Sequence, residues 1–153
     1  MLKVTKIHEN QNLSFILDDG KEQTLERMHF IDYIHQQVNI NCDFLDNSDL
    51  SGCVFINEKF ERINFDGANL TNCDFRGAIF IKCFFDRSNL SGCYCNRTSF
   101  IDCVFLDSNL TGSYFDKASL RKSRFYSSNV SDVTLINTDL RCTNFNNSFV
   151  NSN

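Results

Sequence analysis

From Leu50 onward a large apolar residue recurs at every fifth position, and this spacing continues without a slip to Val150. We call these 21 positions the centres; each holds Leu, Val or Phe except Cys95. A helix, with its period of 3.6 residues, or a strand, with its period of two, could not keep every fifth side chain on its inner side. The spacing therefore predicts a repeat architecture built from five-residue units.

The units share more than their centres. Residues 68–92 read ANLTN, CDFRG, AIFIK, CFFDR and SNLSG: a small residue, a free position, a large apolar residue, and two polar or small residues. This pattern resembles the pentapeptide-repeat family and covers about two thirds of the chain. The resemblance implies an all-β fold, a right-handed, four-sided parallel β-helix with four pentapeptides per coil, so that residues twenty apart stack.

With twenty residues per coil, the centres sort into four columns of similar side chains. Neighbouring coils then lie about 4.8 Å apart, as adjacent strands do, and each buried centre contributes about 1.5–3 kcal/mol. We expect the all-Phe column from Phe65 to Phe145 to form one continuous internal stack of rings. The columns begin at Leu50, Phe55, Phe60 and Phe65.

Two residues before each centre lies a second inward position, which mostly holds Ala, Ser, Thr or Cys. Five of the eight cysteines occupy it: Cys53, Cys73, Cys83, Cys93 and Cys103. Because no C-x2-C pair occurs, we expect these thiols to be buried, reduced and free of metal, acting as small apolar side chains. The alternatives are a zinc site or disulfides between stacked cysteines.

Glu58 occupies the same inward position, two residues before Phe60, where the other units mostly hold small residues. We expect its carboxylate to be turned outward or shielded.

Residues 1–41 lack the five-residue spacing and predict a small α+β cap, with the solenoid spanning residues 42–153. Two short strands are expected at 3–7 and 13–17. A helix is expected from Thr24, because Leu25, Met28, Ile31 and Ile34 recur at every third residue. Cys42-Asp43-Phe44 resembles half a repeat that is out of register with Leu50, which suggests a bulge at 45–47.

Nothing in the sequence indicates catalysis or a cofactor. All three histidines precede residue 36, and no Ser–His–Asp or Cys–His arrangement follows from the spacing. The glycines of the repeat follow their centres by two residues and are expected in turns.

The N-terminus lacks the apolar run of a signal peptide, and no stretch is long enough for a membrane helix, so we expect a cytoplasmic protein. A net charge of −4 argues against direct binding to nucleic acid.

The outer surface is therefore expected to carry the function, and two faces look different. One face repeats Asn before and Ser or Thr after its centres, which predicts a ladder of hydrogen bonds; such a flat polar face could alternatively order water, as in ice-binding β-helices. The faces around Phe60 and Phe65 instead place apolar residues outward, which predicts an interface for a protein partner or for self-association, with a homodimer as one possibility. The candidate interface residues are Ile79, Ile81, Phe84, Ile101, Val104, Leu106 and Tyr126.

The sequence favours a non-enzymatic interaction scaffold with an unidentified partner. The family resemblance implies an alternative: some members mimic duplex DNA and bind type II topoisomerases such as DNA gyrase, which protects the enzyme from quinolones or peptide toxins. Residues 42–153 carry 13 acidic and 11 basic side chains, a net charge of only −2, whereas a DNA mimic needs dense negative charge. Basic residues near the C-terminus, at 117, 121, 122, 124 and 141, form a second candidate surface.

Overall fold

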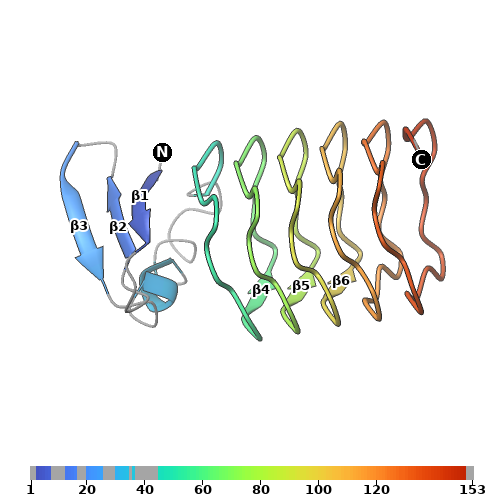
Figure 1. Cartoon of the computed structure of the whole chain (residues 1–153), viewed down its shortest axis with the longest axis horizontal. Helices are drawn as coiled ribbons and strands as arrows, with labels where there is room; N and C mark the ends of the chain where they lie inside the picture. The colour runs from blue at the N-terminus through green and yellow to red at the C-terminus, as the bar shows by residue number, and fades with distance from the viewer. Residues whose placement is uncertain are drawn as a thin grey trace.

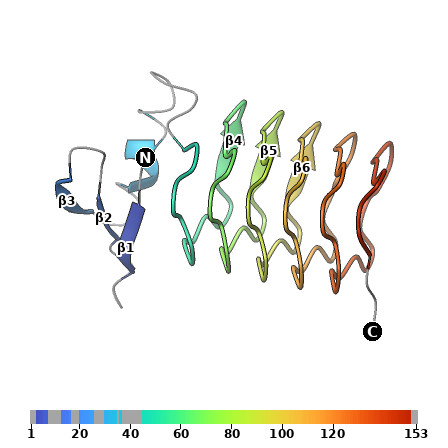
Figure 2. The same ribbon diagram turned by 90° about the horizontal axis from the view of Figure 1, so that it is seen from above.

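Residues 45–150 wind into a right-handed, four-sided β-solenoid in the computed structural model of the chain (Figure 1). The structure describes residues 3–7, 13–16, 20–25, 30–34, 36 and 45–150. Successive coils lie side by side along one axis, and both views show the same regular spacing (Figures 1 and 2). The all-β, four-sided fold that the family resemblance implied is confirmed.

Residues twenty apart pair in parallel on all four sides, which confirms four pentapeptides per coil. On the side of Phe60 the pairing is long enough to form strands: β4 (Lys59–Glu61), β5 (Ile79–Ile81) and β6 (Ser99–Ile101) form a parallel sheet in the order β4-β5-β6. Elsewhere single bridges link neighbouring coils, such as Asn69 with Asn89 and Phe84 with Val104. Each coil therefore holds the next mainly through backbone hydrogen bonds.

Each corner is a tight turn that begins at a centre. At most corners the N–H three residues after the centre donates to the centre's carbonyl, as Cys53 does to Leu50 at 3.0 Å, whereas the corners that follow β4, β5 and β6 are bends. The residue two after each centre has a positive φ at every position from Asn47 to Asn147, as the third residue of a type II turn requires. Five of these residues are glycines, which confirms their predicted place in turns, and the remaining positions are filled mostly by Asn, Asp, Lys and Arg.

Phenylalanine rings fill the interior as parallel stacks. In the column from Phe65 to Phe145, successive rings are nearly parallel, with centroids 4.4–4.9 Å apart. Rings of neighbouring columns meet edge to face, as Phe80 and Phe85 do at 5.4 Å and 74°. Both arrangements are favourable for aromatic pairs, and the predicted continuous stack is confirmed.

The inward corner position is more than a small apolar slot. Its hydroxyl or thiol donates to the carbonyl of the centre 23 residues earlier: Thr98 to Phe75 at 2.6 Å, Ser113 to Leu90 at 2.6 Å and Cys93 to Leu70 at 3.0 Å. Because a Ser, Thr or Cys here satisfies a buried carbonyl, the repeat selects these residues for hydrogen bonding as well as size. Glu58, which occupies the same kind of position, is half-buried.

The last described coil has a neighbouring coil on one side only. Its centres Leu135, Leu140 and Val150 are therefore exposed, Val150 by 72%. An inward direction therefore buries a centre only where a further coil covers it.

The N-terminal segment contains a three-stranded antiparallel sheet in the order β1-β2-β3, formed by β1 (Lys3–Ile7), β2 (Leu13–Ile16) and β3 (Glu22–Leu25). The first two strands were expected, but the third replaces the predicted start of the helix: Thr24 pairs with Ser14 in the sheet. Helical residues begin only at 30 among the described residues, and Met28 lies outside them.

This segment lies at the N-terminal end of the solenoid in both views (Figures 1 and 2). Phe15, Phe30, Ile31 and Ile34 are buried and belong to one hydrophobic core cluster with the first coils. The solenoid register starts earlier than predicted. Leu45 is fully buried, and its carbonyl accepts the N–H of Ser48, so it is a regular centre and the bulge predicted at 45–47 is wrong. The expected boundary at residue 42 lies outside the described residues.

Candidate interaction surface

The seven candidate interface residues, which we call the apolar patch, lie on two adjoining sides of the solenoid. We name these sides by their first aromatic centres: the Phe60 face includes β4, β5 and β6, and the Phe65 face follows it around one corner. Phe84 is 47% exposed, and Ile79, Ile101 and Leu106 are also exposed by more than a third. Ile81, Val104 and Tyr126 are half-buried.

Coil stacking brings the patch residues together in pairs. Ile81 in β5 is the register partner of Ile101 in β6, and Phe84 bridges to Val104 on the next face. These pairs flank the same corner, so the apolar side chains continue around it from one face to the other. Ile79 pairs with the polar Ser99, which marks one edge of the patch.

Charged side chains border the patch. The corner between the two faces carries Arg62, Lys82, Asp102 and Lys122 at successive coils, each with a positive φ that turns the chain. Arg124 follows Val104 in the same column, and its guanidinium lies 3.8 Å from the Asp102 carboxylate. A partner on the patch would therefore meet apolar area with mixed charge at its rim.

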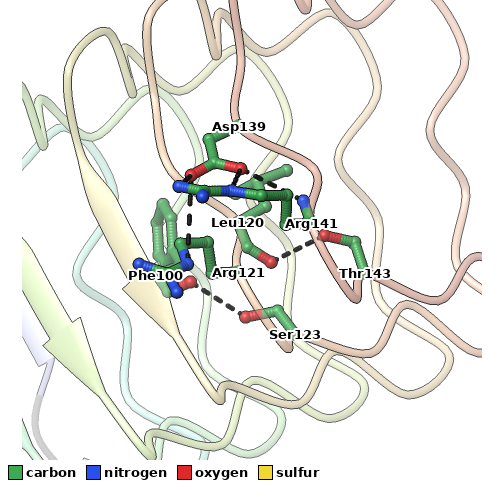
Figure 3. A network of polar contacts seen from close by, with 7 residues as sticks. All are labelled: Phe100, Leu120, Arg121, Ser123, Asp139, Arg141 and Thr143. Carbon is green, nitrogen blue, oxygen red and sulfur yellow. Dashed lines mark hydrogen bonds and ion pairs between the residues drawn. The ribbon is translucent and has the colours of Figure 1, made fainter.

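The basic C-terminal coils are partly neutralised. Figure 3 shows the Asp139 carboxylate between two guanidinium groups, with Arg141 at 2.7 Å and Arg121 at 3.9 Å. The hydrogen bond from Arg141 lowers the pKa of Asp139 to about 2, so this carboxylate stays charged at neutral pH. Beneath it, the hydroxyls of Ser123 and Thr143 bond to the carbonyls of Phe100 and Leu120. The basic residues therefore do not form an unbroken cationic surface.

The predicted polar ladder is present on the face of Leu50. The Asn69 amide donates to Asp49 at 3.0 Å, and Asn109 donates to Asn89 at 3.2 Å, so the bonds run from coil to coil. Thr71 and Thr111 bond back to the same asparagines at 2.6 and 2.7 Å. These side chains are occupied in holding the coils together, which favours the structural interpretation of this face.

The cysteines that were expected inside are buried, free thiols. Burial raises the pKa of the Cys53 thiol to about 12 and holds the pKa of Cys73 well above its usual value. A thiol of this kind is a poor nucleophile because the thiolate is scarce. Cys142 is exposed, and Cys42 lies outside the described residues. Within the described part of the chain, no group of three His, Cys, Asp or Glu residues could hold a metal ion.

Sequence reasoning missed two surface features. Tyr94 and Tyr114 stack outside the solenoid with centroids 5.4 Å apart and planes 8° apart, and Tyr94 is 48% exposed. The two tyrosines are twenty residues apart, which is the length of one coil, so the sequence could have predicted that their side chains stack. The second feature is a hollow of about 770 Å³, lined by side chains from successive coils that no single sequence motif marks. Its lining residues are Ile56, Asn57, Arg76, Asn96, Arg97, Asp116, Lys117 and Ile136.

Comparison with known proteins agrees with this geometry. The family profile described as pentapeptide repeats matches residues 45–80 and 88–125 in eight copies. The chain belongs to the pentapeptide-repeat family. A comparison with curated proteins found no match. Among the residues that the structure describes, no helix is long and apolar enough to cross a membrane.

Several solved structures are similar to the chain. HetL, a pentapeptide repeat protein involved in heterocyst differentiation regulation in the cyanobacterium Nostoc, aligns with a TM-score of 0.57 and 16% identity over 65% of this chain and 56% of HetL. A pentapeptide repeat protein of the cyanobacterium Cyanothece has a TM-score of 0.35 and 16% identity, over 81% of this chain and 99% of that one. Full-length QnrB1, a plasmid-mediated fluoroquinolone resistance protein, has a TM-score of 0.31 and 18% identity over 68% and 61%. At such identities the likeness to HetL shows the fold alone.

Proposed function

We propose that the chain is a non-enzymatic interaction scaffold that binds a protein partner through the apolar patch. The observation that carries this proposal is the exposure of Phe84, Ile101 and Leu106 at positions where the fold accepts polar residues. The equivalent positions in other coils hold Asn64, Arg121 and Asp86, respectively. Packing therefore does not require the apolar side chains, and exposed apolar area of this kind usually marks an interaction site.

The support beneath the patch suits a binding surface. Behind Ile81 and Ile101 the rings of Phe80 and Phe100 stack at 4.8 Å, and the backbones of β5 and β6 are hydrogen-bonded in register. A partner would then meet side chains on an ordered backbone, which reduces the conformational entropy lost on binding. Binding without catalysis is supported by the absence of histidine from residues 45–150 and by the burial of the repeat thiols.

We further propose that residues 1–41 cap the solenoid. A coil end exposes apolar centres, as Val150 illustrates, and repeat proteins usually cover such ends. Phe30, Ile31 and Ile34 share one core cluster with Leu45 and Leu50, which supports this role at the N-terminal end.

The surface gives less support to the topoisomerase alternative. One column of the Phe65 face begins with Asp46, Asp66 and Asp86 but continues with Leu106, and the guanidinium of Arg87 binds Asp66. An acidic stripe that ends after three coils and is partly neutralised would imitate a phosphate backbone poorly. Supercoiling by DNA gyrase in the presence of a quinolone tests this alternative directly, and protection by the purified protein would favour it.

The test of the proposed function is the double substitution Ile81→Asp with Ile101→Asp. Protein partners would be captured from host lysate with the purified chain and with this variant, and bound proteins would be identified by mass spectrometry. We expect loss of the specific partner with little change in melting temperature, because both side chains point away from the core.

The matched control is Tyr94→Asp with Tyr114→Asp. This pair also presents exposed, largely apolar side chains on neighbouring coils but lies on another face, so the control should retain the partner. Capture that survives the isoleucine substitutions would contradict the proposed function, and loss only in the tyrosine variant would move the interface to that face. Unfolding of the isoleucine variant would show that the two side chains are not outward.

A further inference from the structure

The Phe65 face presents two parallel columns of side chains. The column before the centres holds Asn64, Phe84, Val104, Arg124 and Asn144, and the column after them holds Asp66, Asp86, Leu106, Tyr126 and Asn146. Apolar residues lie in the middle of both columns. Acids precede them in the second column, where Asp66 and Asp86 come before Leu106, and a base follows them in the first column, where Arg124 comes after Val104. Coil spacing places equivalent residues of neighbouring coils about 4.8 Å apart.

The charges at the two ends of this apolar strip are weakly satisfied within the chain. Asp86 accepts the N–H of Leu106 at 3.1 Å, and it forms no ion pair among the described residues. Partial burial raises the pKa of Asp86, which indicates that its charged form would gain from a nearby cation. Arg124 reaches Asp102 only at 3.8 Å, and its side chain is 46% exposed.

We propose that this face binds a second copy of the chain in an antiparallel, two-fold symmetric pair centred on the coil of Val104 and Leu106. A two-fold axis that lies in the interface across this coil reverses the order of coils but keeps each column opposite itself. Val104 and Leu106 then face their own equivalents, and each Arg124 faces a Phe84 ring. Asp86 faces Tyr126 and lies diagonally beside Arg124 of the other copy.

This arrangement pairs every side chain of the strip with a suitable partner, and each contact away from the axis occurs twice. Aliphatic groups meet at the axis, a guanidinium covers an exposed ring, and a carboxylate meets a hydroxyl and a cation. A parallel pair would instead place Asp86 near Asp86 and Arg124 near Arg124. The charge order therefore selects the antiparallel pair and a second copy over an unrelated partner.

The inference rests on the proposed function, because it names the partner for the Phe65 half of the apolar patch. The strip covers three coils, about 10 Å along the axis, so the interface is small and the dimer is expected to be weak. Sedimentation equilibrium from about 10 µM to about 1 mM, a range suited to weak pairs, should show a monomer–dimer equilibrium.

Charge reversal tests the predicted pairing. Asp86→Arg alone and Arg124→Asp alone each bring like charges together, and each should weaken dimerisation by about tenfold or more. The combined variant restores opposite charges and should recover most of the affinity. Melting temperatures identify any variant that weakens the fold instead. General destabilisation of the fold would not restore dimerisation in the combined variant. If the combined variant dimerises no better than the single variants, the proposed pairing is overturned.

Crosslinking tests the symmetry. Facing sheets pack about 10 Å apart, which is too far for a disulfide, so Val104→Cys and Leu106→Cys would be treated with a short bismaleimide in a Cys42→Ser, Cys142→Ser background. Both should crosslink to dimers, whereas Ser91→Cys on the polar face should not. A monomer at all concentrations, or crosslinking at Ser91→Cys as efficient as at Val104→Cys, would overturn the inference. The proposed function is tested separately, because the capture experiment with Ile81→Asp and Ile101→Asp changes residues of the Phe60 face. Failure of the dimer tests would therefore leave the proposed function intact.

Discussion

The side-chain amide of Asn57 occupies the space that a Cβ at Gly77 would need. Asn57 Cγ lies 3.4 Å from the ideal Cβ position, and Oδ1 lies closer still. The same relationship joins Asn47 to Gly67 and Asn72 to Gly92, one coil apart in each case. A glycine in this turn position is therefore required by the asparagine below it as well as by its positive φ of 71°.

Gly77→Ala should destabilise the protein more than Gly112→Ala does. Both glycines have positive φ, for which an L-residue pays about 1–2 kcal/mol, but a Cβ at Gly112 would meet nothing within 4 Å. The alanine at Gly77 must also displace the Asn57 amide. Denaturant melts of the two variants measure the difference, and Gly77→Ala should cost less in an Asn57→Ala background, where no amide has to be displaced, than in the wild-type chain. Equal costs at the two glycines would contradict this relationship.

Phe105→Ala should cost about 3–5 kcal/mol of unfolding free energy, the range for removing a buried ring. The Phe105 ring is fully buried and stacks on Phe85 at 4.8 Å and Phe125 at 4.4 Å, so the coils above and below would hold the cavity open. Phe84→Ala serves as the control because its ring is exposed, and it should change stability little. Thermal melts that rank the two variants alike would be inconsistent with the inward stack.

The thiols of the repeat should react slowly in the native protein. Cys73 and Cys93 are fully buried and donate to carbonyls at 3.1 and 3.0 Å, whereas Cys142 is exposed. Alkylation followed by peptide mass spectrometry should label Cys142 about a hundredfold faster than the buried thiols, whose reaction requires opening of the coils. Similar rates in native protein would show that the coils open easily.

Stability should fall as the pH rises above about 8.5, where thiols of the unfolded chain begin to ionise. Burial raises the pKa of Cys53 and Cys73, so the folded state keeps protons that the unfolded state loses, and alkaline pH favours unfolding. Each such thiol removes up to about 1.4 kcal/mol per pH unit well above its unfolded pKa. Cys73→Ser should reduce the slope of unfolding free energy against pH, because Ser113 already fills the same column with a bond to Leu90 at 2.6 Å. An unchanged slope would show that Cys73 ionises equally in both states.

The N-terminal segment shows where sequence reasoning was least reliable. Leu25, Ile31 and Ile34 gave a helix-like spacing, yet Leu25 ends β3 and only the later two residues are helical. Apolar residues spaced three apart over so short a segment are compatible with one long helix. They are equally compatible with the end of a strand followed by a short helix. Pairing of Thr24 with Ser14 decided the outcome, because a strand that can complete a sheet gains backbone hydrogen bonds that local propensity does not register.

The sequence by itself determined the repeat, because a five-residue period repeated 21 times specifies which side chains point inward. The resemblance to the pentapeptide-repeat family supplied the length of a coil, and the columns of like residues agree with it. The sequence also located the outward apolar residues. Only the tertiary structure decided how buried each position is: Leu135 is a regular centre but is exposed, since burial depends on a neighbouring coil. Contacts between coils, such as Asn57 with Gly77 and Arg124 with Asp102, likewise depend on side-chain conformations twenty or more residues apart. The period places those residues near one another, and packing alone sets whether their atoms meet.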